Sequence, residues 1–219
     1  EEDEEVRILL VVNEGPPVKV EKVTFTWEGG DDVGEKERSA VQELSSLGSG
    51  QTFEIPRLND SVGSMRLSLL QRGFATAQVI PSVDVIEGAL RADVTYTVRP
   101  GPRATLGKIV VDGLDGVPTY LVEREVRFAI GQRYSPALVS QVEAALNGMR
   151  VFRWVAAQPQ ATLDADGQME LRVRVSEAEP QSVRLGAALQ FEAARWEELA
   201  VAQYTHTNLF GHLTRLDLG

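Results

Sequence analysis

The chain has 219 residues, no cysteine, 43% hydrophobic residues and a net charge of −10. The length is enough for one large domain or two small ones. The acidic balance argues against a nucleic-acid partner, because phosphates are neutralised by clustered Lys and Arg side chains. The lack of cysteine excludes disulfides and thiolate chemistry, and no apolar run approaches the ~18 residues that a membrane helix needs.

The chain begins with an acidic run that is typical of a solvated terminus. It continues into a β-rich run that closes in a turn at Pro17, and similar endings occur at Pro102 and Pro180. The endings predict four segments. Residues 1–17 would be the last strand of a preceding module. Two complete modules would follow at 18–102 and 103–180, and a segment of another kind at 181–219.

The same elements are predicted in the same order in both modules. Strands are expected at 18–27 and 105–111, and short first helices at 35–47 and 118–128. Inward positions in these first helices are Val41, Leu44 and Leu47 in one module and Leu121, Val122 and Val126 in the other. A longer second helix follows in each module.

The second helices carry the clearest repeat. Apolar residues recur at i, i+4, i+7 and i+11 in both, displaced by 80 residues. They are Leu58, Val62, Met65 and Leu69 in the first module and Leu138, Val142, Ala145 and Met149 in the second. Pro56 and Pro136 suit a first helical turn, and Ser135 is a candidate cap. The sequences Gly-Gln-Thr-Phe (50–53) and Gly-Gln-Arg-Tyr (131–134) precede these helices at matching places.

Two prolines distinguish the last two strands of each module. Pro81 and Pro159 lie in the strands that follow the second helices, and a proline cannot donate to a strand ladder. We therefore expect these strands at a sheet edge and the proline-free strands 92–98 and 170–175 at the centre. The alternative is that the prolines mark bulges or loops. The predicted unit is β-α-α-β-β.

From residue 182 the hydrophobic period changes to two. The alternating apolar residues are Val183, Leu185, Ala187, Leu189 and Phe191. Such alternation fits a soluble sheet or a lipid-facing barrel strand, since both have one wet and one dry face. The pattern alone leaves both open.

The β-α-α-β-β repeat resembles a POTRA domain. The run 204–211, which contains Asn208, Leu209, Phe210 and Gly211, resembles the opening strands of the barrel in BamA- and TamA-type outer-membrane proteins. The fold class expected from this resemblance is α+β, with tandem POTRA-like modules followed by the first antiparallel strands of a truncated membrane β-barrel. A barrel needs at least about eight strands, so we expect the chain to hold only part of one.

No catalytic constellation is legible in the sequence. An enzyme site needs a nucleophile with a base, a metal cluster or a phosphate cradle. His206 and His212 are six residues apart and lack a nearby acidic ligand motif, and the glycine-rich stretches lack the Lys-Ser/Thr sequel of a P-loop. We expect no enzymatic activity, no metal and no cofactor.

The resemblance implies a function in the bacterial cell outer membrane. The modules would lie in the periplasm and receive unfolded outer-membrane or secreted polypeptides, which the barrel would insert into the membrane or translocate. Accessory periplasmic or outer-membrane proteins are further candidate partners. Two alternatives stay open: a structural scaffold that tethers accessory proteins to a barrel, and a soluble α/β ligand-binding or hydrolytic protein.

The mechanism that suits varied clients is β-augmentation, in which an extended segment pairs with a sheet edge through its backbone. We predict that the edge strands 75–85 and 154–163 receive the client. The residues expected to shape the contact are Val79, Ile80, Val83 and Val155. The prolines in these strands would limit uncontrolled pairing.

Overall fold

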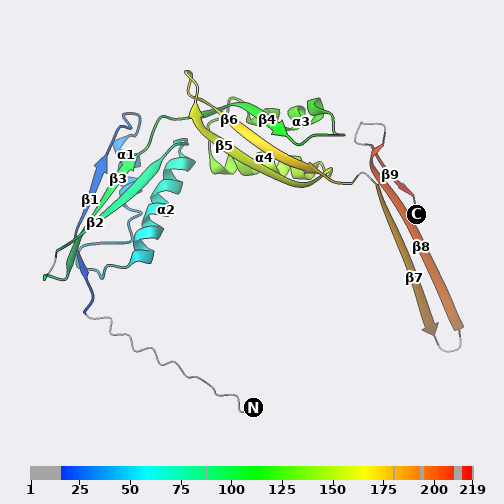
Figure 1. The fold of residues 1–219 in the computed structure, drawn as a ribbon, viewed down its shortest axis with the longest axis horizontal. Helices are drawn as coiled ribbons and strands as arrows, with labels where there is room; N and C mark the ends of the chain where they lie inside the picture. Colours follow the sequence, from blue (N-terminus) through cyan, green and yellow to red (C-terminus); the bar gives the residue numbers. More distant parts are fainter. Residues whose placement is uncertain (1–15, 87, 180, 193–194, 210–213, 219) are drawn as a thin grey trace, which may run out of the picture. The chain divides into compact units, whose positions relative to one another are not determined.

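The computed structural model describes residues 16–86, 88–179, 181–192, 195–209 and 214–218 (Figure 1). The predicted strand before residue 18 therefore lies almost wholly outside the described residues. The chain divides into two compact units. The first runs to Pro100 without Leu70–Thr76, and the second takes in that short segment and the chain from Gly101 onward.

The first module is a three-stranded sheet with two helices. Its elements are β1 (Lys19–Trp27), α1 (Glu35–Gln42), α2 (Ile55–Gln71), β2 (Gln78–Ile86) and β3 (Arg91–Arg99). The strand order is β1-β3-β2, with β1 parallel and β2 antiparallel to β3. Every second residue of β3 is fully buried: Ala92, Val94, Tyr96 and Val98. Pairing on both sides places β3 at the centre of the sheet, and the period-two burial shows that one of its faces lies on the core.

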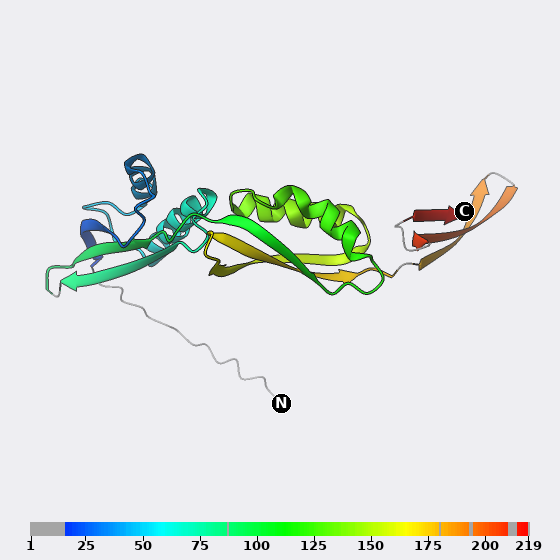
Figure 2. The ribbon, with the colours of Figure 1, turned by 90° about the horizontal axis from the view of Figure 1, so that it is seen from above.

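The second module repeats this plan. Its elements are β4 (Thr105–Asp112), α3 (Thr119–Val126), the short 3₁₀ helix η1 (Arg127–Ala129), α4 (Pro136–Gly148), β5 (Phe152–Leu163) and β6 (Gln168–Glu177). The order is β4-β6-β5, again with one parallel and one antiparallel pair. Figure 2 shows α3 and α4 on one face of this sheet. The core between these helices and the sheet includes Leu106, Val142 and Leu171.

The predicted helical stripes are confirmed at most positions. Leu58, Met65 and Leu69 are buried in α2, while Val62 is half-buried. In α4 Leu138 and Val142 are buried and Ala145 is half-buried, and Met149, which directly follows the helix, is also half-buried. The inward positions predicted for the α3 region are all buried. None of the helices in the described ranges combines the length and the hydrophobicity needed to cross a lipid bilayer.

The first helix of the first module is shorter than predicted. α1 ends at Gln42 rather than at residue 47, so Leu44 leaves the helical phase and is 37% exposed. The prediction that Leu44 points inward is wrong. Leu47 is buried, but from the connecting segment instead of a helix. The capping prediction for α4 is confirmed, since Ser135 Oγ accepts a hydrogen bond from the Leu138 N–H at 3.1 Å.

The proline-bearing strands are edge strands, as predicted. β2 pairs with β3 on one side, and β5 pairs with β6 on one side. Pro81 sits opposite Tyr96 in an unbroken register. Pro159 sits opposite Leu171, and the register of β5 shifts directly after it. The alternative that the prolines mark irregularities therefore holds in part, at Pro159.

The last described segment is an antiparallel sheet of three strands. They are β7 (Gln181–Glu192), β8 (Arg195–Leu209) and β9 (Thr214–Leu218), in the order β7-β8-β9. β7 and β8 pair without a register shift over the whole of β7. Of the predicted barrel motif, Asn208 and Leu209 end β8, while Phe210 and Gly211 lie outside the described residues.

Candidate functional site

The outer edge of β1 is covered by the chain that precedes α2. The N–H of Val20 donates to the carbonyl of Gln51, and the N–H of Gly50 donates to the carbonyl of Val20, both at 2.8 Å. Phe53 N–H donates to the carbonyl of Val18 at 2.8 Å. Backbone groups at the start of β1 are therefore already paired.

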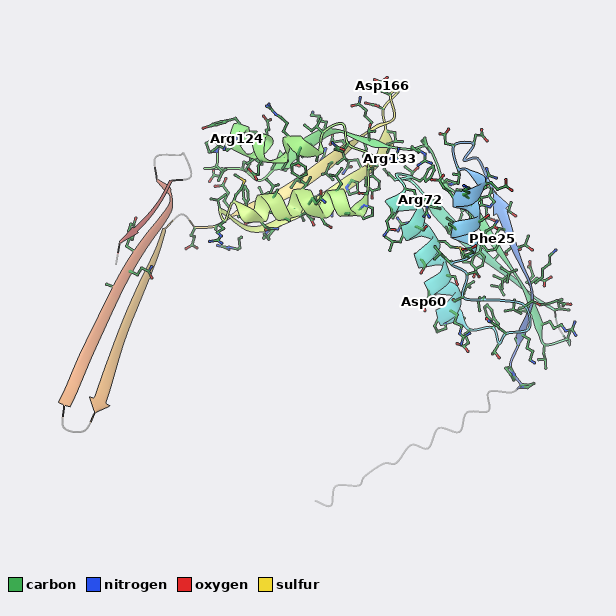
Figure 3. The ribbon with its side chains drawn as sticks, turned by 180° about the vertical axis from the view of Figure 1, so that it is seen from behind. Phe25, Asp60, Arg72, Arg124, Arg133 and Asp166 are labelled. Carbon is green, nitrogen blue, oxygen red and sulfur yellow. The ribbon has the colours of Figure 1, made fainter. Side chains whose placement is uncertain are left out.

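The second module covers β4 in the same way. The N–H of Leu106 donates to the carbonyl of Gln132 at 2.9 Å, and the N–H of Tyr134 donates to the carbonyl of Ala104 at 2.9 Å. Arg133, labelled in Figure 3, lies in this loop and forms a β-bridge with Thr105. The repeated Gly-Gln-x-aromatic sequences thus have a structural role, since each adds a short pairing to the first strand of its module.

The outer edge of β2 is open from Val79 to Ile86 among the described residues, whereas the carbonyl of Ala77, just before the strand, accepts a hydrogen bond from Nε of Arg66 at 3.2 Å. The Glu28 N–H donates to the carbonyl of Val98 at 3.0 Å, so Val98 turns its backbone groups toward β1. In an antiparallel ladder the pairs alternate between hydrogen-bonded and non-hydrogen-bonded. The partners opposite Val98, Val94 and Ala92 therefore turn their backbone groups away from β3. Those partners are Val79, Val83 and Val85.

Pro81 agrees with this alternation. It lies opposite Tyr96, two residues from Val98, and is therefore also at an outward-facing position. Because proline has no backbone N–H, Pro81 leaves the outer edge with one donor fewer. The hydrogen bonds between β2 and β3 are not affected. The outward donors that remain along β2 are those of Val79, Val83 and Val85.

The side chains of β2 divide between two faces. Val79 is 7% exposed and packs in the core, and Val83 is half-buried. Ile80 is 42% exposed, and Val85 and Ile86 are also exposed. Of the residues predicted in this strand, Ile80 exposes its side chain, while Val79 and Val83 turn their backbone groups outward.

The outer edge of β5 is less regular. Its register with β6 shifts between Phe152 and Trp154 and again between Pro159 and Leu163. Val155, the predicted contact residue in this strand, packs partly against the core. Trp154 is 48% exposed, although core packing is the default expectation for a tryptophan beside a strand.

The hairpin that joins β5 to β6 is closed by an aspartate turn. Asp164 Oδ1 accepts from the N–H of Asp166 at 3.0 Å and from the N–H of Gln168 at 2.7 Å. Figure 3 shows Asp166 at the hairpin tip. An aspartate that bonds the backbone of its own turn is a recurrent turn device, so these carboxylates have a structural explanation.

Two hollows lined by described residues do not resemble a catalytic pocket. One of about 390 Å³ is lined by Lys108, Asp164 and Glu170 among others, and one of about 370 Å³ by Lys19, Glu21 and Arg91 among others. Both mix charges of opposite sign, and Arg91 pairs with Glu21 at 3.0 Å. In the described ranges no three His, Asp or Glu side chains are grouped so that they could hold a metal ion.

The chain is similar in sequence to a known outer-membrane protein. No protein-family model matches the chain. The outer membrane protein assembly factor BamA of Nitratidesulfovibrio vulgaris is 24% identical over 176 residues, which is 80% of this chain. The match spans 22% of that relative, so the chain corresponds to a minor part of its length.

Solved structures share the fold of the chain. BamA from Haemophilus ducreyi lacking POTRA domains 1–3 aligns with 91% of this chain and 36% of its own, at a TM-score of 0.69 and 19% identity. Haemophilus influenzae BamA POTRA3–5 aligns with 75% of this chain and 63% of its own, at a TM-score of 0.60 and 20% identity. The chain resembles the POTRA region of BamA-type proteins, and the predicted α+β class with two β-α-α-β-β modules is confirmed. The relative is an assembly factor, which agrees with the non-enzymatic prediction.

Proposed function

We propose that the two modules are periplasmic receivers for unfolded outer-membrane or secreted polypeptides, within a protein that inserts or translocates such clients at the outer membrane. The POTRA-like fold and the similarity to an outer-membrane assembly factor support this proposal. The observation that carries it is the outward edge of β2. An open edge binds an extended segment through backbone hydrogen bonds, with little demand on its sequence.

The features of β2 fit a site for transient strand addition. Val83 and Val85 present adjacent outward donors, and the exposed Ile80 and Ile86 offer apolar surface beside them. Pro81 interrupts the row of donors, which limits the length of a continuous ladder and so protects the edge from irreversible pairing. Affinity would come from few hydrogen bonds and modest apolar burial, as suits a client that must be released.

Photo-crosslinking tests the docking edge. A crosslinking amino acid at Ile80 in the full-length protein is expected to label a urea-unfolded outer-membrane β-barrel protein strongly. The same probe at Thr52, which is exposed in the loop that covers β1, and at Glu43, which is exposed after α1, is expected to label at least about fivefold less. Mass spectrometry of the adducts measures the yields.

Equal labelling at Ile80, Thr52 and Glu43 would contradict docking at the β2 edge. Labelling by folded accessory proteins, with none by the unfolded client, would favour the scaffold function instead. The three positions lie in the same module, so a general loss of folding affects them alike and is recognised as such.

We further propose that β7, β8 and β9 are the first strands of an outer-membrane barrel. The chain up to residue 180 makes up about 82% of the 219 residues. A structural match that covers 91% of the chain therefore includes part of the segment that holds β7–β9. β7 and β8 have 12 and 15 residues, which is long enough for a tilted membrane strand of ~9–11 residues. The apolar alternation in β7 supplies one lipid-compatible face.

Single-cysteine labelling tests the barrel proposal, since these 219 residues contain no cysteine and any cysteine elsewhere in the full-length protein can be replaced by serine. The full-length protein, reconstituted in phospholipid vesicles, would carry Leu189→Cys or Gln190→Cys, which place the thiol on opposite faces of β7. We expect a water-soluble maleimide to label Gln190→Cys at least about tenfold faster than Leu189→Cys. Equal rates in vesicles would contradict a lipid-facing Leu189.

A further inference from the structure

The two proline-bearing edge strands, β2 and β5, differ in whether their outward-facing N–H groups already have a hydrogen-bond partner. In the second module the N–H of Thr105 donates to the carbonyl of Gly167 at 3.2 Å, so odd-numbered residues of β6 face β4. Their partners in β5 then face away from the sheet. Those partners are Val155, Ala157 and Pro159, opposite Val175, Val173 and Leu171.

The outward amide of Ala157 is already occupied. Its N–H donates to Oε1 of Glu143 at 2.7 Å, and Glu143 belongs to α4, which packs beside β5. This is a short, charge-assisted bond, and the carboxylate is half-buried. An incoming strand would have to displace Glu143 before it could pair at this point.

The neighbouring positions of β5 offer no substitute. Pro159 has no N–H, and the register breaks between Pro159 and Leu163. The only other outward donor in the regular part of this edge is Val155. A second strand needs donors at every second residue to form a ladder, and β5 does not offer two in succession.

Among the described residues of the first module, no carboxylate accepts from an outward amide of β2 in the way that Glu143 accepts from Ala157. The residue 80 positions before Glu143 in the repeat is Gly63 in α2, where even a Cβ atom would meet nothing within 4 Å. Its edge strand β2 has two successive outward donors, Val83 and Val85, and an unbroken register. The two modules therefore share a fold and a proline but differ in edge chemistry.

We propose that strand addition takes place at β2 of the first module, and that Glu143 closes the equivalent edge of the second module. This inference rests on the proposed function and assigns the client site to one of the two modules. The segment that fits β2 is extended and carries apolar side chains at every second residue, because these would cover Ile80 and Ile86 on the outer face. Glu143 would act as a fixed intramolecular competitor for backbone amides.

The substitution Glu143→Ala tests the closing role, with Glu143→Gln as the conservative control. Glutamine keeps an acceptor oxygen for Ala157, whereas alanine removes it. In the full-length protein we expect Glu143→Ala to speed amide hydrogen exchange at Ala157 at least about tenfold. Glu143→Gln should remain within about threefold of the natural protein.

Client docking is measured by crosslinking from Gln158, which is exposed on β5 next to Ala157, and from Ile80 on β2. The probe is a urea-unfolded outer-membrane β-barrel protein. In the natural protein we expect labelling at Ile80 to exceed that at Gln158 at least about fivefold. Glu143→Ala should raise labelling at Gln158 at least about threefold and leave Ile80 unchanged, and Glu143→Gln should change neither.

The outcomes separate this inference from the function on which it rests. Equal labelling at Ile80 and Gln158 in the natural protein overturns the assignment to one module and leaves the receiver function standing. Unchanged labelling at Gln158 or unchanged exchange at Ala157 in Glu143→Ala overturns the closing role of Glu143. Absence of labelling at both positions in every variant overturns the proposed function and the inference together.

Discussion

Replacing Gly113 with alanine is expected to destabilise the second module by about 3 kcal/mol. Gly113 follows β4 and has φ +97°, a conformation that residues with a Cβ rarely adopt. A Cβ atom here would also overlap the backbone oxygen of Val175 in the central strand β6. That oxygen cannot retreat unless β6 moves, and β6 is held on both sides by β4 and β5.

The control for Gly113→Ala is Gly131→Ala in the same module. Gly131 also has a positive φ of +80°, but its Cβ would meet nothing within 4 Å. It therefore carries the conformational cost, of about 1 kcal/mol, without the steric overlap. The difference between the two variants isolates the clash with Val175.

Amide hydrogen exchange in the full-length protein measures both variants, because it reports the opening free energy of each module separately. We expect exchange in β6, at Leu171 and Val173, to speed about 150-fold in Gly113→Ala and about fivefold in Gly131→Ala. Exchange at Val94 and Tyr96 in the first module should not change. Similar effects of the two substitutions would show that the overlap with Val175 is relieved at little cost.

The order of the elements could be predicted because its signals are local. The 80-residue spacing of the stripe that contains Met65 and Val142 identifies the repeat, and Pro81 and Pro159 identify the edge strands. The prediction failed where a local signal was ambiguous. Leu44 continues an apolar spacing, but α1 ends before it and the chain turns.

The chemistry of the edges could not be predicted in the same way. Glu143 is one of 32 acidic residues, and nothing in its neighbourhood marks it as the acceptor for Ala157, 14 residues away. The matching Gly-Gln-x-aromatic loops are visible as a repeat, yet their pairing with β1 and β4 depends on contacts between distant residues. Such contacts can be inferred only once the order of the strands in the sheet is known.

Glu177 illustrates what the sheet order adds. β4 and β6 are parallel, so their carboxyl ends meet, and the turn after β4 lies beside the end of β6. Oε1 of Glu177 accepts from the N–H of Asp115 at 2.8 Å and of Val117 at 2.9 Å, and Oε2 accepts from the N–H of Gly116 at 2.9 Å. One carboxylate thus holds three successive amides of the segment that leads into α3.

In the first module, an arginine side chain holds the turn after the first strand. Arg38 in α1 donates from Nη2 to the carbonyl of Gly30 at 3.2 Å and from Nε to the carbonyl of Val33 at 3.3 Å. Its guanidinium also lies 5.1 Å from the centre of the Trp27 ring. The turn after the first strand is therefore fixed in both modules, through carbonyls in one and through amides in the other.

Substituting Glu177 with glutamine is expected to destabilise the second module by about 2 kcal/mol at pH 7, because hydrogen bonds to a charged acceptor are lost and an NH₂ group faces backbone donors. The control is Glu179→Gln. The side chain of Glu179 is 85% exposed, and its Oε1 lies 3.6 Å from Nη2 of Arg153 in a surface ion pair. Loss of this pair should lower the stability by less than about 0.5 kcal/mol. Hydrogen exchange in β6 measures both variants.

The effect of Glu177→Gln should also depend on pH. Partial burial alone would raise the pKa of Glu177, but the N–H donors of Asp115, Val117 and Gly116 outweigh it, so the pKa lies below the usual value for a glutamate. A carboxyl with a lowered folded-state pKa contributes stability that is present above its unfolded pKa of about 4.3. That contribution is lost as the pH falls through the folded-state pKa.

The stability difference between the natural protein and Glu177→Gln should therefore be constant from about pH 5.5 to 8 and shrink below about pH 4. At low pH both side chains are neutral, and each offers one carbonyl oxygen to the three amides. A difference that grows on acidification would have the wrong sign for a carboxylate held by donors. A pH-independent difference would mean that glutamine fails for reasons of shape, and that the charge of Glu177 does not hold the turn before α3.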